Sequence, residues 1–248
     1  MNSKVFSLLC ASTLVACSIL GTDQKEINAQ ETQETPQAIV TTNFSEAHVQ
    51  YKNRCTNTFL NNSKPLSLLV DQYKKNNPTA EAKRSIHVKK RCRVLTIYLD
   101  GTAIKQYDTA LSINPSEDKI QQGDMATPTG TFYIVSKDRQ DQRETSFYKA
   151  LHISYPNEED AIRGYEQGLI TKNQKDSIIN ATQSCTKPSQ STKLGSLIKI
   201  HGLGGYFSSG DWTHGCMGLD NEDMDEIFDF AQTGCYKNGE YRTSIHIE

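Results

Sequence analysis

The mostly-β character of this chain is clearest in residues 94–107, which read VLTIYLDGTAIKQY. Two runs rich in β-branched and aromatic residues flank the dipeptide Asp100-Gly101. An Asp-Gly pair suits the tight turn of a β-hairpin, because both residue types tolerate the positive φ that such a turn needs. Residues 94–99 and 102–107 are therefore predicted to form a hairpin that opens a sheet.

Further short apolar runs predict the rest of this sheet and leave room for few helices. The expected strands cover residues 108–113, 127–135, 151–156, 196–200 and 243–247. Helical spacing predicts one helix over residues 63–76 and another after Leu219, capped by Asp220 or Asn221. Residues 80–91 are interpreted as a helical turn or a loop, and the polar segment 157–191 as a helical or irregular insertion. The predicted fold is mostly β, with short helices and an N-terminal helical preface.

The N-terminal residues are predicted to export and anchor the chain. Lys4 precedes an apolar run, residues 5–16, that has the length of a signal-peptide core and is too short to span a bilayer. The run ends in Leu14-Val15-Ala16-Cys17, which resembles the lipobox of bacterial lipoproteins. That resemblance implies cleavage before Cys17, a lipid on that cysteine and a periplasmic protein, with Ser18 favouring an outer-membrane anchor. An ordinary secretory signal is the alternative.

Composition then divides the remainder. Residues 17–47 are polar and are predicted to be a lipid-anchored flexible tether, residues 48–91 a helical preface, and residues 92–248 the mostly-β domain. Removal of residues 1–16, which contain one lysine and no acidic residue, changes the formal net charge from −2 to −3. Without a basic excess, binding to nucleic acid is not expected.

The cysteine count points to one free thiol. Of seven cysteines, Cys10 lies in the signal and Cys17 is the lipidation candidate, which leaves five in an oxidising compartment. An odd number leaves one unpaired. Four cysteines allow three connectivities, of which we favour Cys55–Cys92 with Cys185–Cys235. Cys216 is the expected free cysteine, because it alone has histidine and glycine neighbours.

A candidate site for thiol chemistry lies in Thr213-His214-Gly215-Cys216, with Ile200-His201-Gly202 upstream. Cysteine becomes a strong nucleophile as the thiolate, and a nearby histidine can accept its proton. Glycines beside the thiol permit a sharp turn whose backbone N–H groups can face a developing oxyanion. The pattern indicates acyl transfer by a cysteine.

Residues 93–248 resemble the L,D-transpeptidase catalytic domain family of peptidoglycan enzymes. The resemblance rests on the Asp100-Gly101 hairpin, on Thr127-Pro128-Thr129-Gly130-Thr131-Phe132, on His201-Gly202 and on Thr213-His214-Gly215-Cys216-Met217. It implies a β-sandwich-like catalytic domain and a peptidoglycan stem peptide as the partner. The implied reaction attacks the bond between diaminopimelate and D-alanine, forms a thioester and passes the acyl group to an amine. It requires no cofactor and no metal. The sequence does not indicate an oligomeric state.

The resemblance also implies a role for each residue of the motif. Cys216 would be the nucleophile and His201 the general base, with the carbonyl of Gly202 orienting the His201 ring. An oxyanion site would come from His214 and the backbone N–H groups of Gly215 and Cys216, while Thr213 would hold the loop by a local hydrogen bond. Substrate contacts are expected from Trp212, Gly218 and Tyr155.

Two departures from the family pattern favour a hydrolytic alternative. Gly218 stands where cross-linking members commonly carry arginine, and only 14 residues separate His201 from Cys216, so the lid over residues 204–212 is short. A carboxypeptidase or endopeptidase acting on stem peptides or on protein–peptidoglycan links is therefore an alternative to transpeptidation.

Two further hypotheses belong to other classes. One is a zinc peptidase with His201, His214, Cys216 and His246 as ligands, although no acidic ligand or base lies close to them in sequence. The other is an inactive lipoprotein that only binds peptidoglycan.

Overall fold

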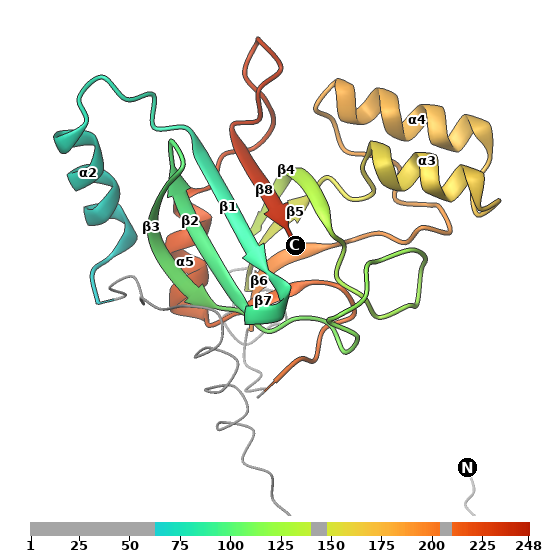
Figure 1. The fold of residues 1–248 in the computed structure, drawn as a ribbon, viewed down its shortest axis with the longest axis horizontal. Helices are drawn as coiled ribbons and strands as arrows, with labels where there is room; N and C mark the ends of the chain where they lie inside the picture. The colour runs from blue at the N-terminus through green and yellow to red at the C-terminus, as the bar shows by residue number, and fades with distance from the viewer. Residues whose placement is uncertain (1–62, 140–147, 204–209) are drawn as a thin grey trace, which may run out of the picture. The chain divides into compact units, whose positions relative to one another are not determined.

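An eight-stranded sheet organises the described part of the chain (Figure 1). The structure is a computed structural model that describes residues 63–139, 148–203 and 210–248. The strands are β1 (Arg84–Lys89), β2 (Val94–Leu99), β3 (Thr102–Asp108), β4 (Gly130–Arg139), β5 (Lys149–Ile153), β6 (Lys199–Gly202), β7 (Met217–Leu219) and β8 (Thr243–Ile247). They lie in the order β3-β2-β1-β8-β4-β5-β6-β7. The prediction of a mostly-β fold is confirmed.

The two ends of this sheet are joined through the chain that follows β3. Ala110 and Gly218 exchange both of their backbone hydrogen bonds, with N···O distances of 2.8 and 2.9 Å. The Thr109 hydroxyl also donates to the Gly218 carbonyl at 3.0 Å. The sheet is therefore nearly closed into a barrel, and this pairing protects the edge of β7. The predicted strand over residues 108–113 is present only as isolated bridges.

The first strand of the sheet lies where a helical turn or loop was expected. Residues 84–89 form β1, which pairs antiparallel with β2 and parallel with β8. Ile86 and Val88 are fully buried and alternate with more exposed polar residues, which is the pattern of a half-buried strand. Basic residues on both sides hide this short alternation in the sequence. The sheet consequently begins before the expected boundary at Cys92.

Helices cover parts of the sheet and form the insertion between β5 and β6 (Figure 1). Helix α2 (Leu66–Asn76) packs on β3 and α5, and α5 (Asn221–Phe230) packs on β5 and β6. The core-facing side of α5 consists of Met224, Ile227 and Phe230. This face joins the large apolar cluster inside the sheet, so α5 supports the strands that carry the candidate site.

The polar segment 157–191 contains two helices, α3 (Glu158–Glu166) and α4 (Lys172–Gln183). Each begins with a reciprocal capping box, formed by Asn157 and Asp160 in α3 and by Thr171 and Gln174 in α4. The two helices pack together around a small separate core of Ala161, Ile170, Ile178 and Leu194.

The structure contains the Cys185–Cys235 disulfide favoured above, which links the end of α4 to the segment after α5. Cys92 is also disulfide-bonded. Its predicted partner, Cys55, lies outside the described residues, as do the predicted signal peptide, Cys17 and the predicted tether. Within the described ranges, no helix has both the length and the apolar composition needed to cross a membrane.

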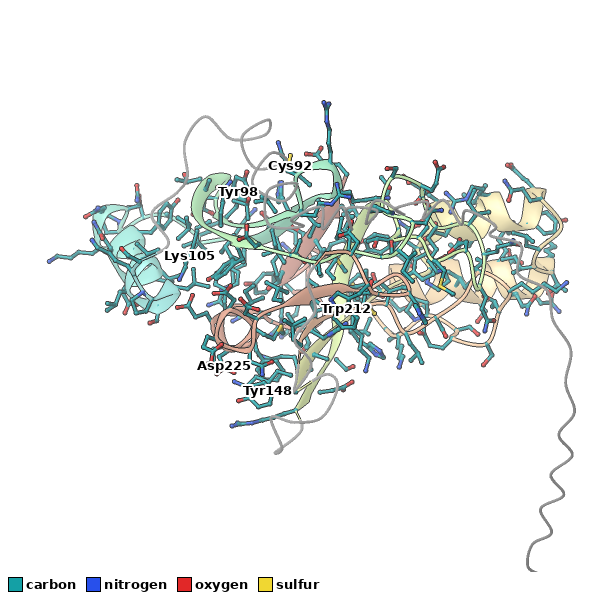
Figure 2. All side chains as sticks on the ribbon, turned by 90° about the horizontal axis from the view of Figure 1, so that it is seen from below. Cys92, Tyr98, Lys105, Tyr148, Trp212 and Asp225 are labelled. Carbon is teal, nitrogen blue, oxygen red and sulfur yellow. A yellow bond between two sulfur atoms is a disulfide. The ribbon has the colours of Figure 1, made fainter. Side chains whose placement is uncertain are left out.

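A buried polar cluster fastens β3 to α5. The Lys105 ammonium, labelled in Figure 2, lies 2.6 Å from the Glu226 carboxylate, and the Tyr107 hydroxyl donates to the same oxygen at 2.7 Å. Lys105 also donates to the backbone carbonyl of Lys64. Lys105 and Tyr107 are almost fully buried, and the Glu226 carboxylate is the acceptor that they share.

Replacement of this carboxylate should destabilise the fold. We expect Glu226→Ala to lower the free energy of unfolding by about 2–3 kcal/mol, because it leaves the buried Lys105 ammonium without its counter-charge and the buried Tyr107 hydroxyl without its acceptor. Urea unfolding followed by circular dichroism measures the change. Asp229→Ala, at an exposed position one turn later on α5, should alter stability by no more than about 0.5 kcal/mol. Equal effects of the two substitutions would contradict this prediction.

Candidate active site

Parallel pairing of β6 with β7 brings the candidate nucleophile and base together. His201 is the register partner of Gly218. Cys216 precedes Gly218 by two residues, and residues two apart along an extended segment lie on the same face. His201 and Cys216 therefore lie on one face of the sheet, although 14 residues separate them in sequence.

These two residues line one cavity of about 380 Å³. The other residues around it are Ser196, Leu197, Ile198, Trp212, Thr213 and His214. The Cys216 thiol is free and partly buried, as the site requires. The volume of this cavity falls within the usual range for small-molecule pockets.

The His201 ring is oriented as expected. Its Nδ1 lies 3.0 Å from the carbonyl oxygen of Gly202. A carbonyl can only accept, so Nδ1 carries the proton of the neutral ring and Nε2 carries the lone pair. The Trp212 indole meets the ring edge-on at 5.7 Å between centroids (Trp212 is labelled in Figure 2). The arrangement presents the basic nitrogen that a general base needs.

Burial keeps both groups neutral in the resting protein. It raises the pKa of the Cys216 thiol to about 11, although the backbone N–H of Lys199 and the charges of Lys199 and Lys119 act in the opposite direction. Burial also lowers the pKa of His201 to about 4, against a smaller raising effect of the Gly202 hydrogen bond. At pH 7 the pair is therefore thiol and imidazole, and proton transfer must accompany attack.

The thiol has a specific resting partner that the sequence analysis did not identify. Cys216 Sγ donates to the carbonyl oxygen of Leu197 at 3.5 Å. Leu197 has a φ of 61°, a left-handed conformation that is unfavourable for leucine, and its side chain is exposed at the cavity. The side-chain oxygen of Gln190 accepts from the Leu197 N–H at 2.9 Å and holds this conformation.

The loop before the nucleophile is fastened at several points. Thr213 donates its hydroxyl to the Cys216 carbonyl at 2.7 Å, as expected of a residue that holds the loop. The backbone N–H groups of Trp212 and Thr213 both donate to Leu111 O, and Ile113 N–H donates to Thr213 O. These bonds connect the loop to the segment that closes the barrel.

Glycine is required at position 215 for packing, and its expected oxyanion role is not supported. A Cβ there would lie 2.8 Å from Ile198 Cδ1 and 2.9 Å from Ala126 O, and φ is 133°. The Gly215 N–H already donates to the Thr213 hydroxyl at 3.3 Å. Exposed His214 and the N–H of Cys216 are the remaining candidate donors of the predicted set.

Gly218 makes room for the wall of the cavity. A Cβ at this position would lie 3.1 Å from Trp212 Cζ2. The Trp212 indole, predicted to contact substrate, occupies the space that a side chain at residue 218 would need. Its Nε1 is buried and has no hydrogen-bond partner among the residues that the structure describes. The lack of a side chain at Gly218 therefore leaves room for the Trp212 indole. Gly218 has no side chain with which to contact the substrate.

Two of the proposed site residues lie elsewhere. Tyr155 was expected to contact substrate, but it is fully buried and donates its hydroxyl to Leu194 O at 2.8 Å, so that assignment is wrong. His246, a ligand in the zinc alternative, lies against His87 at 4.7 Å between ring centroids and contacts Thr131. The described residues contain no group of three or more His, Cys, Asp or Glu side chains suited to a metal.

A comparison with protein-family models identifies the family. The L,D-transpeptidase catalytic domain family matches residues 83–243. Similar solved structures include the helical cell shape determining protein Pgp2 from Campylobacter jejuni, at 18% identity and a TM-score of 0.46, covering 74% of this chain and 55% of that one. Bd1075 from Bdellovibrio bacteriovorus has 18% identity and a TM-score of 0.43, covering 68% of this chain and 50% of that one.

An L,D-transpeptidase from Xylanimonas cellulosilytica has 12% identity and a TM-score of 0.38, with 71% of this chain and 68% of that chain covered. This chain spans about half the length of Pgp2 and of Bd1075. The comparison with curated protein sequences gave no significant match.

Alkylation should report the neutral resting state of Cys216. Because the thiolate is the reacting form and the pKa is about 11, we expect the rate with iodoacetamide to keep rising up to about pH 11. At pH 7 it should be roughly a hundredfold below that of an unperturbed thiol. Mass spectrometry of the peptide containing Cys216 measures the rate. A plateau between pH 6 and 8 would reveal a preformed ion pair and contradict this account.

The packing of Trp212 on Gly218 can be tested by fluorescence, since Trp212 is the only tryptophan. Gly218→Ala should displace the indole, expose it to water and move its emission maximum to longer wavelength. Leu68→Ala, at an exposed position of α2, serves as the control. An unchanged spectrum of the Gly218→Ala protein would be evidence against this packing.

Proposed function

Because this chain belongs to the L,D-transpeptidase catalytic domain family, we propose that it transfers acyl groups on peptidoglycan stem peptides through a thioester on Cys216. The observation that carries the proposal is the common cavity of Cys216 and His201. A free thiol and an oriented, neutral imidazole on one sheet face are the two groups that cysteine acyl transfer requires.

In the first half-reaction, Nε2 of His201 takes the proton from the Cys216 thiol while the sulfur attacks the carbonyl carbon of diaminopimelate. The new C–S bond gives a tetrahedral oxyanion. Its collapse breaks the C–N bond to the terminal D-alanine, whose nitrogen takes the proton from His201. D-Alanine leaves and a thioester remains on Cys216.

In the second half-reaction, an amine of another stem attacks the thioester carbonyl and transfers a proton to His201. The C–S bond breaks, the proton returns to sulfur, and an amide cross-link forms. No cofactor is needed in either half. When water replaces the amine, the same steps give hydrolysis.

Side chains around the cavity fit these steps. His214 lines the cavity and, with the Cys216 N–H, is the proposed donor to the oxyanion. The neutral resting pair disfavours reaction of the thiol before substrate arrives, because thiolate forms only during attack.

The choice between an amine and water as acceptor rests on the substrate contacts. Gly218 offers no side chain to hold a stem, which favours the hydrolytic alternative. Trp212 fills that space and shields one side of the cavity, which favours exclusion of water and hence transpeptidation. We place transpeptidation first.

Digestion of purified sacculi with the protein, followed by muropeptide analysis, tests this function. We expect new 3–3 cross-links together with release of D-alanine. Cys216→Ala should abolish both products, and His201→Gln should reduce the rate by about 10²–10⁴-fold, because it removes the general base. Loss of terminal D-alanine without cross-links would establish the carboxypeptidase instead.

His152→Gln is the matched control, because His152 is a second buried histidine of the sheet that does not line the cavity. The rate of cross-link formation by the His152→Gln protein should stay within about threefold of the rate of the unmodified protein. If sacculi are unchanged by a folded protein with a free thiol, the proposed enzyme activity is wrong and binding alone remains.

A further inference from the structure

A second cavity adjoins the one that contains Cys216. Its volume is about 480 Å³, within the range of ligand pockets. It is formed by the turn between α3 and α4 together with residues 190–196, and its polar lining includes Gln122, Thr171, Gln174, Gln190, Lys193 and Ser196. The insertion between β5 and β6 therefore builds a cavity in addition to packing on its own small core.

The two cavities share a wall. Ser196 lines both of them. Gln190 lines the second cavity, while its side-chain oxygen accepts from the N–H of Leu197, which lines the first. Leu197 O is in turn the acceptor for the Cys216 thiol. Because Ser196 borders both cavities, a ligand that extends across Ser196 would contact both of them.

The lining defines the chemistry of such a ligand. Gln190 is engaged with Leu197, Tyr155 and Pro188, and Thr171 and Gln174 cap α4. The amide of Gln122 and the hydroxyls of Ser191 and Ser196 offer both donors and acceptors, which suits the hydroxyl and acetamido groups of a neutral sugar. Leu169 and Ile170 add an apolar patch. Lys193 carries the only charge among the residues around this cavity, and its ammonium can donate hydrogen bonds to the hydroxyl and acetamido oxygens of the sugar. A protonated acceptor amine would be repelled from the same place.

We infer that this second cavity binds the N-acetylated sugar end of the donor muropeptide, while the scissile end of its stem lies at Cys216. The inference rests on the proposed function, since it concerns the same substrate. Binding of the sugar would make residues 157–196 a determinant of substrate specificity. A stem peptide attached to its sugars would then bind more tightly than the free peptide. Gln122 and Lys193 are exposed side chains that can be replaced without disturbing a core.

Isothermal titration of the Cys216→Ala protein provides the test. The two ligands are the free tetrapeptide stem and the same tetrapeptide attached to the N-acetylglucosamine–N-acetylmuramic acid disaccharide. We expect the disaccharide peptide to bind about tenfold more tightly, a difference of about 1.4 kcal/mol. Adding Gln122→Ala and Lys193→Ala should remove this advantage and leave binding of the free peptide unchanged.

Lys187→Ala is the control, because it removes an exposed charge from the same insertion without lining the cavity. It should preserve the advantage of the disaccharide peptide. Equal affinities for the two ligands would overturn the inference. An equal loss of affinity for both ligands in the protein with Gln122→Ala and Lys193→Ala would overturn it as well. If neither ligand binds, the proposed function itself fails, and the inference fails with it.

Discussion

The parallel pairing of β6 with β7 is the constraint on which the candidate site depends. It sets His201 opposite Gly218 and so places Cys216 on the same face. A short parallel strand such as β7 would leave an open edge, but the reciprocal hydrogen bonds between Ala110 and Gly218 cover it. Gly218 therefore serves three contacts: with β6, with the barrel closure and with the Trp212 indole.

Burial gives the same site its chemical character. It disfavours charge on both Cys216 and His201, so the reactive ion pair is absent at rest and must form while substrate is attacked. The Leu197 carbonyl, which faces the thiol, stabilises the protonated form. Gln190 holds that carbonyl through the Leu197 N–H and belongs to the wall of the second cavity. The insertion is thereby connected to the nucleophile through two hydrogen bonds.

Local sequence patterns predicted most of the strands and the residues of the candidate site. The features that the sequence did not predict depend on contacts between residues distant in sequence or on weak local patterns. The 94–107 hairpin and the closing strand at 243–247 have strong alternating or β-branched patterns, and both are present. Strand β1 was missed because only two buried residues mark it among basic neighbours. The left-handed Leu197 has no signal in sequence, since the Gln190 contact that holds it comes from seven residues away. Tyr155 was misplaced because the sequence does not show which way an aromatic at the end of a strand points, and this one packs in the core with its hydroxyl bonded to Leu194 O.

The central claim is that the sulfur of Cys216 carries the acyl group, with His201 as its base. Intact-mass and peptide mapping of the protein quenched in acid during reaction with a tetrapeptide stem tests it most directly. The account predicts a tripeptide acyl adduct on the peptide containing Cys216, labile to hydroxylamine as a thioester is. Turnover with that peptide unmodified, or with the adduct on another residue, would contradict it.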